Sequence, residues 1–307
     1  MSTRTIASLF GPTLIAMFFA SSAAGQVQRT FVSGLGNAGN PCSRTAPCRT
    51  FGQAIMQTSG GGEVIVLDSA GYGTFAISKA ISITAPPGVY AGISSFSGHG
   101  ITIDAGSTDT VILRGLTLSS QGSNGDGIKF NTGGTLHVEN CVVNGFTGGT
   151  AVAFLSSGNL EVKDSIFRGN FAGIVVISSP GKSTAAIDQV RLEGNSFGFV
   201  ANEGSKVTVR NSLASGGTAG FASASANSDA VEMNVENCVA TNNDTGMEAQ
   251  SGSTGVATLR VSNSVVTDNA IGLKNFGTPA VLLSRGNNTV EGNGTDTSGS
   301  VGSYSGK

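Results

Sequence analysis

The chain contains few charged and few aromatic residues. The distribution of its basic and of its apolar residues excludes two classes of function. Of its 307 residues 12% are charged, none is tryptophan, three are tyrosine and two are histidine, and the formal net charge is −2. Lysine and arginine form no cluster, so we expect no nucleic-acid partner. Beyond the first 25 residues no apolar run is long enough to cross a bilayer, so we expect no membrane span.

The first 25 residues have the features of a secretory signal peptide. Arg4 precedes an apolar stretch, Ile6–Ala20, and small residues follow it at 21–25. Such a segment is cleaved on export. We therefore assign 1–25 to a signal peptide and expect a secreted or periplasmic protein.

What the chain does have is glycine, 46 residues of it, and a sequence repeat. Seven copies of a short apolar run, an Asn-like residue and a second apolar run lie 22 to 26 residues apart. The Asn-like column is Asn140, Asp164, Gln189, Asn211, Asn237, Asn263 and Asn287. A period in the twenties is typical of a solenoid, whose units bury their apolar faces only against their neighbours.

The pattern within each repeat predicts β-strands. In one copy Val207 and Val209 flank Thr208, an alternation with the period of two that marks a half-buried strand. Gly or Asn ends each run within about eight residues, too short for ordinary helices. A leucine-rich repeat has a similar period but needs spaced leucines, and here Val, Ile and Ala prevail. We therefore predict an all-β parallel β-helix over 63–293, with about nine coils.

Two columns of the repeat have expected structural roles. Asn tolerates the left-handed backbone of a tight turn, and stacked Asn amides about 4.8 Å apart can form an inward hydrogen-bonded ladder. The residues just before the Asn column alternate in charge, which would stabilise adjacent parallel strands and fix their register. They are Arg114, Glu139, Lys163, Asp188, Arg210 and Glu236.

The ends of the solenoid and the four cysteines complete the domain plan. Residues 26–62 are expected to form an N-terminal cap with a short amphipathic helix, Phe51–Gln57, and a disulfide loop joining Cys42 to Cys48. Cys141 and Cys238 share a column four coils apart, so we expect buried free thiols. Residues 294–307, rich in Gly, Ser and Thr, are expected to form a flexible tail.

Several segments resemble a known group of proteins. The N-terminal ones are Thr30-Phe-Val-Ser-Gly34, Asn40-Pro-Cys42, Ala46-Pro-Cys-Arg-Thr-Phe51 and 61–73, and later coils carry Asn170-Phe-Ala-Gly173 and Asn269-Ala-Ile-Gly272. They are similar to exported bacterial right-handed parallel β-helix repeat proteins of the pectin-lyase-like superfamily. The resemblance covers nearly the whole mature chain and implies right-handed coiling and a polysaccharide-related role. The superfamily mixes lyases, hydrolases, epimerases and adhesins, so fold alone does not choose the activity.

In each repeat a glycine precedes a further short apolar run, and these glycines form a column: Gly149, Gly173, Gly198, Gly220, Gly246 and Gly272. In calcium-dependent lyases of the superfamily that the chain resembles, the outer face of the sheet that follows this column carries the carboxylates that hold Ca²⁺. Here its expected outward column is Lys129, Ala151, Val175, Val200, Ala222, Glu248 and Lys274. The middle four residues are aliphatic, and Ca²⁺ requires several oxygen ligands. The pattern argues against such a lyase, and we expect no metal and no cofactor.

The two histidines, His99 and His137, lie in different sequence contexts. Gly98-His99-Gly100 matches a tripeptide of polygalacturonases, but the Asn-Thr-Asp element and paired Asp that precede it there are missing, so we interpret it as coincidence. His137 has Glu161 as its column neighbour, with Glu139 and Lys163 two residues along each strand. We interpret this as an ordinary polar face, with His137, Glu161 and Lys163 as candidate catalytic residues for proton abstraction beside a uronate.

The sequence thus favours a polysaccharide-binding or surface-interaction module; the alternative is a uronate lyase or epimerase. Candidate binding residues are Glu139, Lys129, Glu248 and Lys274. The aliphatic face around Val175 and Val200 is expected to be covered by a loop such as Ser178–Thr184, by a protein partner or by self-association.

Overall fold

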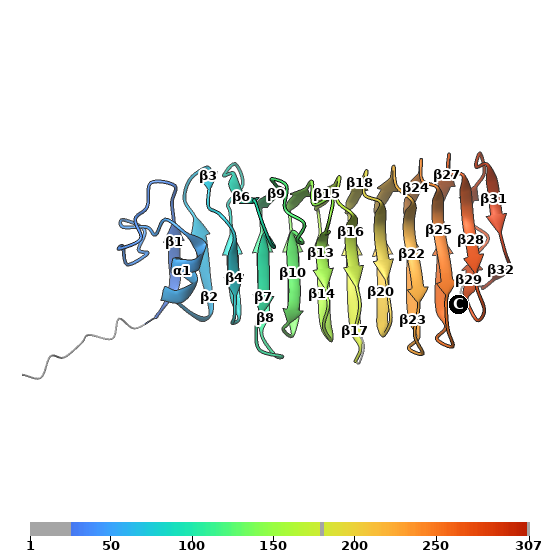
Figure 1. The fold of residues 1–307 in the computed structure, drawn as a ribbon, viewed down its shortest axis with the longest axis horizontal. Coiled ribbons are helices and arrows are strands. Elements are labelled where there is room, and N and C mark those ends of the chain that lie inside the picture. Colours follow the sequence, from blue (N-terminus) through green and yellow to red (C-terminus); the bar gives the residue numbers. More distant parts are fainter. Residues whose placement is uncertain (1–25, 179–180, 306–307) are drawn as a thin grey trace, which may run out of the picture.

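The structure is a computed structural model that describes residues 26–178 and 181–305. It is a rod of stacked coils whose strands run side by side along its length (Figure 1). Each coil contributes one strand to each of three parallel sheets, which confirms the predicted parallel β-helix. The proposed signal peptide lies outside the described residues. Within the described part no helix is long and apolar enough to cross a membrane.

Sheet A contains twelve strands and the other two contain ten each, close to the nine coils expected. Sheet A comprises β1 (Val27–Val32), β2 (Thr58–Val66), β5 (Ile81–Thr84), β8 (Thr110–Arg114), β11 (Thr135–Glu139), β14 (Gly158–Lys163), β17 (Ser183–Asp188), β20 (Ser205–Arg210), β23 (Val231–Glu236), β26 (Ala257–Ser262), β29 (Val281–Ser284) and β32 (Val301–Ser303).

Sheets B and C follow in each coil. Sheet B comprises β3 (Ala70–Gly71), β6 (Ala91–Ser95), β9 (Leu116–Ser120), β12 (Val142–Asn144), β15 (Ile166–Arg168), β18 (Arg191–Glu193), β21 (Leu213–Ser215), β24 (Val239–Thr241), β27 (Val265–Thr267) and β30 (Thr289–Val290). Sheet C comprises β4 (Phe75–Ile77), β7 (Ile101–Asp104), β10 (Ile128–Thr132), β13 (Thr150–Phe154), β16 (Ala172–Val176), β19 (Phe197–Ala201), β22 (Ala219–Ser225), β25 (Thr245–Ser251), β28 (Ile271–Phe276) and β31 (Thr295–Ser298).

The core is a column of apolar side chains inside the three sheets. Val207 and Val209 are buried while Thr208 between them is exposed, as the period of two requires. Phe130 and Phe154 stack in the core with ring centroids 4.5 Å apart. Adjacent coils therefore bury each other's apolar faces, as a solenoid must.

The Asn-like column lies at the turn between sheets A and B, and its backbone is left-handed as predicted. Six of its members have φ between 49° and 56°: Asn140, Asp164, Gln189, Asn211, Asn237 and Asn263. The expected inward orientation is wrong, because these side chains are exposed. In a two-residue turn the left-handed residue points its side chain to solvent, and the next residue of the chain points inward.

The inward ladder is built by a different column, at the turn between sheets B and C. It consists of Asn170, Asn195, Asn243, Asn269 and Asn293. Asn170 donates to Asn195 Oδ1 at 2.9 Å, and Asn269 donates to Asn293 Oδ1 at 3.0 Å. Gly217 takes the place of an Asn between Asn195 and Asn243, where its backbone N–H donates to Asn243 Oδ1.

The alternating charges do stack. The register pairs each of the six residues with its neighbours in the predicted order, from Arg114 to Glu236. Arg114 forms an ion pair with Glu139 at 2.7 Å, and Arg210 forms one with Asp188 at 3.1 Å. The predicted register of sheet A is therefore confirmed.

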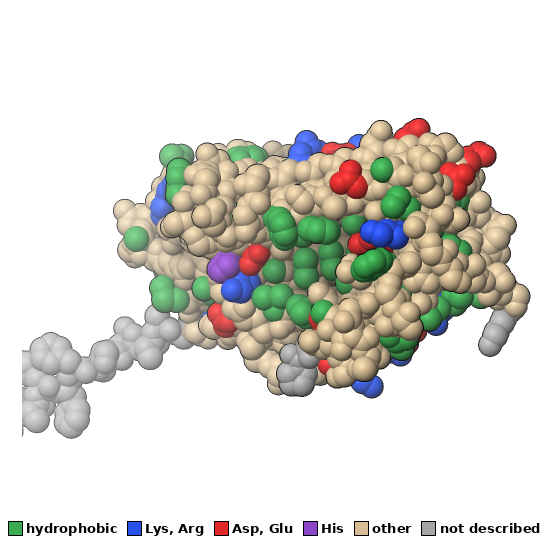
Figure 2. All heavy atoms as spheres, turned by 45° about the vertical axis from the view of Figure 1, so that its right-hand side comes forward, with side chains coloured by type: hydrophobic (Ala, Val, Ile, Leu, Met, Phe, Trp, Pro, Cys, Tyr) green, Lys and Arg blue, Asp and Glu red, His purple; other side chains and the backbone are tan. Residues whose placement is uncertain are grey.

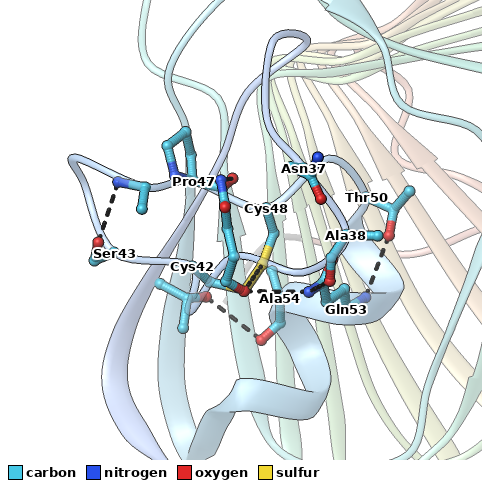
Figure 3. Close-up of a disulfide and its surroundings, with 12 residues drawn as sticks. Asn37, Ala38, Cys42, Ser43, Pro47, Cys48, Thr50, Gln53 and Ala54 are labelled. Carbon is cyan, nitrogen blue, oxygen red and sulfur yellow. Dashed lines mark hydrogen bonds between the residues drawn. A yellow bond between two sulfur atoms is a disulfide. The ribbon is translucent and has the colours of Figure 1, made fainter.

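The N-terminal end is closed by the predicted helix α1, Phe51–Gln57. Thr50 caps it by accepting from the Gln53 N–H, and Phe51 and Ala54 are buried. The disulfide between Cys42 and Cys48 is present beside this helix (Figure 3). One strand of the cap was not anticipated: β1 pairs with β2 and extends sheet A beyond the expected start at residue 63.

The expectation of a flexible tail at 294–307 is wrong for its described part. Strands β31 and β32 lie there and pair with β28 and β29, respectively. The segment therefore forms the last of the described coils, and most of its residues are exposed. Cys141 and Cys238 are free and buried in one column, as predicted, and burial raises the pKa of each thiol to about 11.

Candidate functional site

The predicted catalytic residues lie together on the outer face of sheet A. His137 of β11 and Glu161 of β14 are register neighbours, and His137 Nδ1 lies 3.0 Å from Glu161 Oε2. Lys163 lies two residues beyond Glu161 on the same face, opposite Glu139. The spacing of the repeat thus brings the three candidates to one place, with their side chains accessible to solvent.

Next to this group the face is hollowed. Two contiguous hollows, of about 360 and 420 Å³, share Glu161, Ala186 and Thr208. We call them together the sheet A trough. Ala186 follows Glu161 in the register and Thr208 follows Ala186, so two short side chains form a low floor.

Charged and amide side chains form the rim of the trough. Lys206 and Arg260 both contact Glu232, at 3.3 and 3.1 Å, on β23. Hydrogen bonds from Arg260 and Lys206 hold the pKa of Glu232 below its usual value. Asn159, Thr184 and Asn234 add neutral hydrogen-bonding groups. The trough therefore offers donors and acceptors of both charge signs around a small apolar floor.

On the outer face of sheet C, one residue of the predicted outward column is wrong. Its outward column runs Lys129, Ala153, Val175, Val200, Ala222, Glu248 and Lys274. Ala153 stands where Ala151 was predicted. Ala151 aligns instead with the column of Gly173 and Gly198, where a Cβ built on Gly173 approaches the core residue Leu192. Ala151 is accordingly fully buried.

We call the middle part of this column the aliphatic strip; it comprises Ala153, Val175, Val200 and Ala222. Charged residues lie at both ends of the strip. Lys129 lies at one end. Glu248 and Lys274 lie at the other, 3.7 Å apart, and the Glu248 side chain is only 12% exposed. Desolvation raises the pKa of Glu248, and Lys274 opposes that rise only in part.

A polar cluster that sequence reasoning set aside lies beside Lys129. His99 Nδ1 is 3.3 Å from Asp126 Oδ2 and accepts the Asp126 backbone N–H, while Lys129 Nζ lies 3.4 Å from Nε2. Figure 2 shows a histidine next to acidic and basic side chains at one end of a band of hydrophobic side chains. The signal in the sequence was the 27-residue separation of His99 and Asp126, which is one coil.

The four candidate binding residues therefore divide between two faces. Glu139 lies on sheet A, in contact with Arg114, whereas Lys129, Glu248 and Lys274 lie on sheet C. Among the described residues no group of three His, Cys, Asp or Glu side chains gathers closely enough to hold a metal ion.

Comparison with known proteins agrees with this architecture. A family model described as a right-handed β-helix region matches residues 99–295. A comparison with curated proteins gives no match. Among solved structures, pectate lyase Pel9A superposes with a TM-score of 0.60 at 17% identity, over 92% of this chain and 78% of that one. A rhamnogalacturonan lyase gives a TM-score of 0.45 at 13% identity, over 86% of this chain and 87% of the other.

At these identities the solved structures show a shared fold only. The family model spans more than half of the chain and covers every coil that builds the sheet A trough and the aliphatic strip. The chain therefore belongs to the right-handed β-helix family.

Proposed function

We propose that the chain binds a polysaccharide along the sheet A trough. The observation that carries the proposal is the low floor of Ala186 and Thr208 between polar rims, which leaves room for sugar rings against short side chains. Hydroxyl groups need both donors and acceptors, and the rims provide them as amides, hydroxyls and charged groups. The trough runs along the rod, so a linear polymer can follow it across several coils.

The cationic side chains favour an acidic polymer. Lys206 and Arg210 are more than half exposed at the rim, where each can bind a uronate carboxylate while it remains close to its acidic neighbour. We place this binding outside the cytoplasm, where a disulfide such as Cys42–Cys48 persists.

The test is calorimetric titration of the protein with polygalacturonate, with a neutral glucan as reference. Ala186→Phe fills the trough floor at an exposed strand position that tolerates an aromatic residue, and affinity should fall about tenfold or more. Arg210→Gln should weaken polygalacturonate binding and leave neutral glucan binding unchanged. Thr241→Phe, on the outer face of sheet B, is the matched control. Equal binding by Ala186→Phe and wild type would exclude the trough.

A second candidate function is a uronate lyase or epimerase, favoured by the contact between His137 and Glu161 at the trough edge. Glu161 can orient the imidazole as a base, and Lys163 can neutralise the carboxylate next to the carbon that loses its proton. A lyase would form an unsaturated uronide that absorbs ultraviolet light, and an epimerase would exchange the C5 proton with solvent deuterium. His137→Gln should abolish either reaction but retain binding. If wild type shows neither signal, catalysis is excluded and binding stands.

A further inference from the structure

The aliphatic strip is an apolar outward surface with a defined arrangement of charges. Val175 and Val200 are partly exposed at its centre, whereas Ala153 and Ala222, one coil beyond them on either side, are each only 3% exposed, so the two valines provide most of the accessible apolar surface of the strip. The next positions outward are Lys129 on one side and Glu248 on the other. A contiguous apolar patch on an outer face usually marks an interaction site.

We propose that this face binds a second copy of the chain, with the two β-helices antiparallel. The two-fold axis runs parallel to the strands of sheet C and passes between Val175 and Val200. It places Val175 of one copy against Val200 of the other, and Ala153 against Ala222. It also places Lys129 against Glu248 of the second copy, and the symmetry makes this contact twice.

The column two residues further along the strands is compatible with the same axis. Asn131 comes to face Gln250 of the second copy, so that two amides can exchange hydrogen bonds. The connections that lead from the strands of sheet C to those of sheet A lie at this edge, and their lengths are complementary. The short connection 133–134 faces the long one at 252–256, and 155–157 faces 226–230. Long connections of one copy thus meet short ones of the other.

Other arrangements of the same two faces are disfavoured by charge. A parallel pair of helices would place Lys129 against its own copy and Glu248 against its own copy. A shift of the antiparallel pair by one coil places Lys129 either against Lys274 or against Ala222, where its charge is unpaired. Like charges or unpaired charges in a contact are costly, so the sequence of the column selects one register.

Glu248 is suited to this contact by its surroundings in the single chain. Its carboxylate lies mostly buried, with the ammonium group of Lys274 at 3.7 Å as the ion pair formed within the chain. Lys129 of the second copy would bring a second ammonium group to the other side of the carboxylate. The contact therefore supplies a charge-assisted partner to a group that burial leaves poorly solvated.

The expected dimer is weak. From Lys129 to Lys274 the column covers six coil spacings, roughly 29 Å, and a five-residue strand is roughly 16 Å long. Two such faces bury roughly 900 Å² in total, below the usual range for stable complexes. We therefore expect a dissociation constant on the order of 10 to 100 µM.

Sedimentation velocity of the mature protein over a range of concentrations tests the proposal. Wild type should show monomer and dimer in exchange. Lys129→Glu and Glu248→Lys should each weaken self-association about tenfold or more, because each creates two like-charge contacts. An equimolar mixture of these two variants should form a heterodimer, because both of its contacts then join Glu to Lys. Arg44→Glu, in the exposed disulfide loop, should dimerise like wild type.

Three results would overturn the proposal. The first is a wild-type monomer up to about 1 mM, far above the expected dissociation constant. The second is self-association that neither Lys129→Glu nor Glu248→Lys weakens. The third is two weakened variants whose mixture fails to associate although both keep the wild-type circular dichroism spectrum and melting temperature. Loss of polygalacturonate binding in Val175→Asp without change in sedimentation would assign the strip to saccharide instead.

Discussion

At the scale of single residues, the left-handed turn between sheets A and B explains why Asn recurs. Asn237 has φ of 52° and donates a side-chain hydrogen bond to Asn211 Oδ1 at 2.6 Å. The left-handed conformation is strained for a side chain branched at Cβ and free of strain for glycine. The backbone conformation of the turn therefore determines which residue types are favoured there. The exposed side-chain hydrogen bond contributes less to the preference for Asn than the backbone does.

The left-handed backbone at Asn237 predicts the effects of two substitutions there. Asn237→Val should lower the free energy of unfolding by about 1 to 2 kcal/mol, because a β-branched residue must adopt positive φ. Asn237→Gly should change it by less than about 0.5 kcal/mol, because glycine loses only the exposed contact. Chemical denaturation of both variants is the measurement. An equal loss in both would show that the side-chain contact, and not the backbone, determines the choice.

Glu248 gives a prediction for pH dependence. Its folded-state pKa is raised by desolvation, so the folded protein holds this proton to a higher pH than the unfolded chain does. Stability contributed by this group is therefore present below the ordinary pKa of 4.5 and lost as pH rises through the raised folded value. Denaturation at a series of pH values should show a fall in this window that Glu248→Gln lacks. The measurement is made at protein concentrations too low for the proposed dimer to form. If the free energy of unfolding of wild type and of Glu248→Gln depends on pH in the same way, the prediction is wrong.

At the scale of the repeated element, the Asn ladder between sheets B and C fixes the distance between coils. Asn243 accepts from the Gly217 backbone N–H, donates to the Ala214 carbonyl and donates to Asn269 Oδ1. It is 5% exposed, so these groups have little access to water. Each side chain in this column thus supplies a partner to the backbone of its neighbouring coils.

Asn243→Ala should therefore destabilise the protein far more than substitutions in the exposed Asn column. Removing the amide takes away the acceptor of the Gly217 N–H and the donor to the Ala214 carbonyl and to Asn269 Oδ1, which should cost about 2 to 4 kcal/mol. The exposed neighbour Asn242 has φ of 56°, so Asn242→Gly, which keeps that backbone free of strain, provides the control in the same turn. Because a solenoid opens locally, amide hydrogen exchange should increase most in the coils around 214–269. A uniform increase along the rod would contradict this view of the ladder.

The two Asn columns also show how far the sequence alone can go. The repeat period and the alternation around Thr208 were sufficient to predict strands, their order and the charge register. They could not show which of the two Asn columns points inward, because that depends on the number of residues in each turn. Ala151 was misplaced for the same reason: its turn, from Asn144 to Thr150, contains more residues than the corresponding turns of later coils.

The cluster at His99 was missed for a different reason. His99 and Asp126 are one coil apart, but both precede Asn140, the first member of the Asn-like column, so the coil that joins them lies before the seven copies of the repeat. The contact between His137 and Glu161 lies within those copies and was predicted. Side-chain neighbours in a solenoid can be predicted from sequence only where the phase of the repeat is known.

At the scale of the whole molecule, the two ends of the rod determine whether it stays separate from other rods. An uncovered end strand can pair with another chain. At the N-terminal end the disulfide loop covers the free edge of β1: the Phe31 N–H donates to the Cys42 carbonyl at 2.8 Å, and the Cys48 N–H donates to the Phe31 carbonyl at 3.0 Å. The loop thus occupies the hydrogen-bonding groups that an incoming strand would use.

The disulfide should therefore control assembly at the ends of the rod. In Cys42→Ser/Cys48→Ser the short loop is no longer closed, and the cap should lose about 2 kcal/mol of local stability. The edge of β1 then becomes available, and light scattering should show end-to-end species that grow with concentration. The Lys129→Glu background removes the proposed dimerisation through sheet C, so that only the ends can contribute. Cys141→Ser/Cys238→Ser is the matched control, because serine already stands at the equivalent positions 165, 212 and 264. A Cys42→Ser/Cys48→Ser protein that keeps the size of this control at every concentration would show that the loop covers the edge without its disulfide.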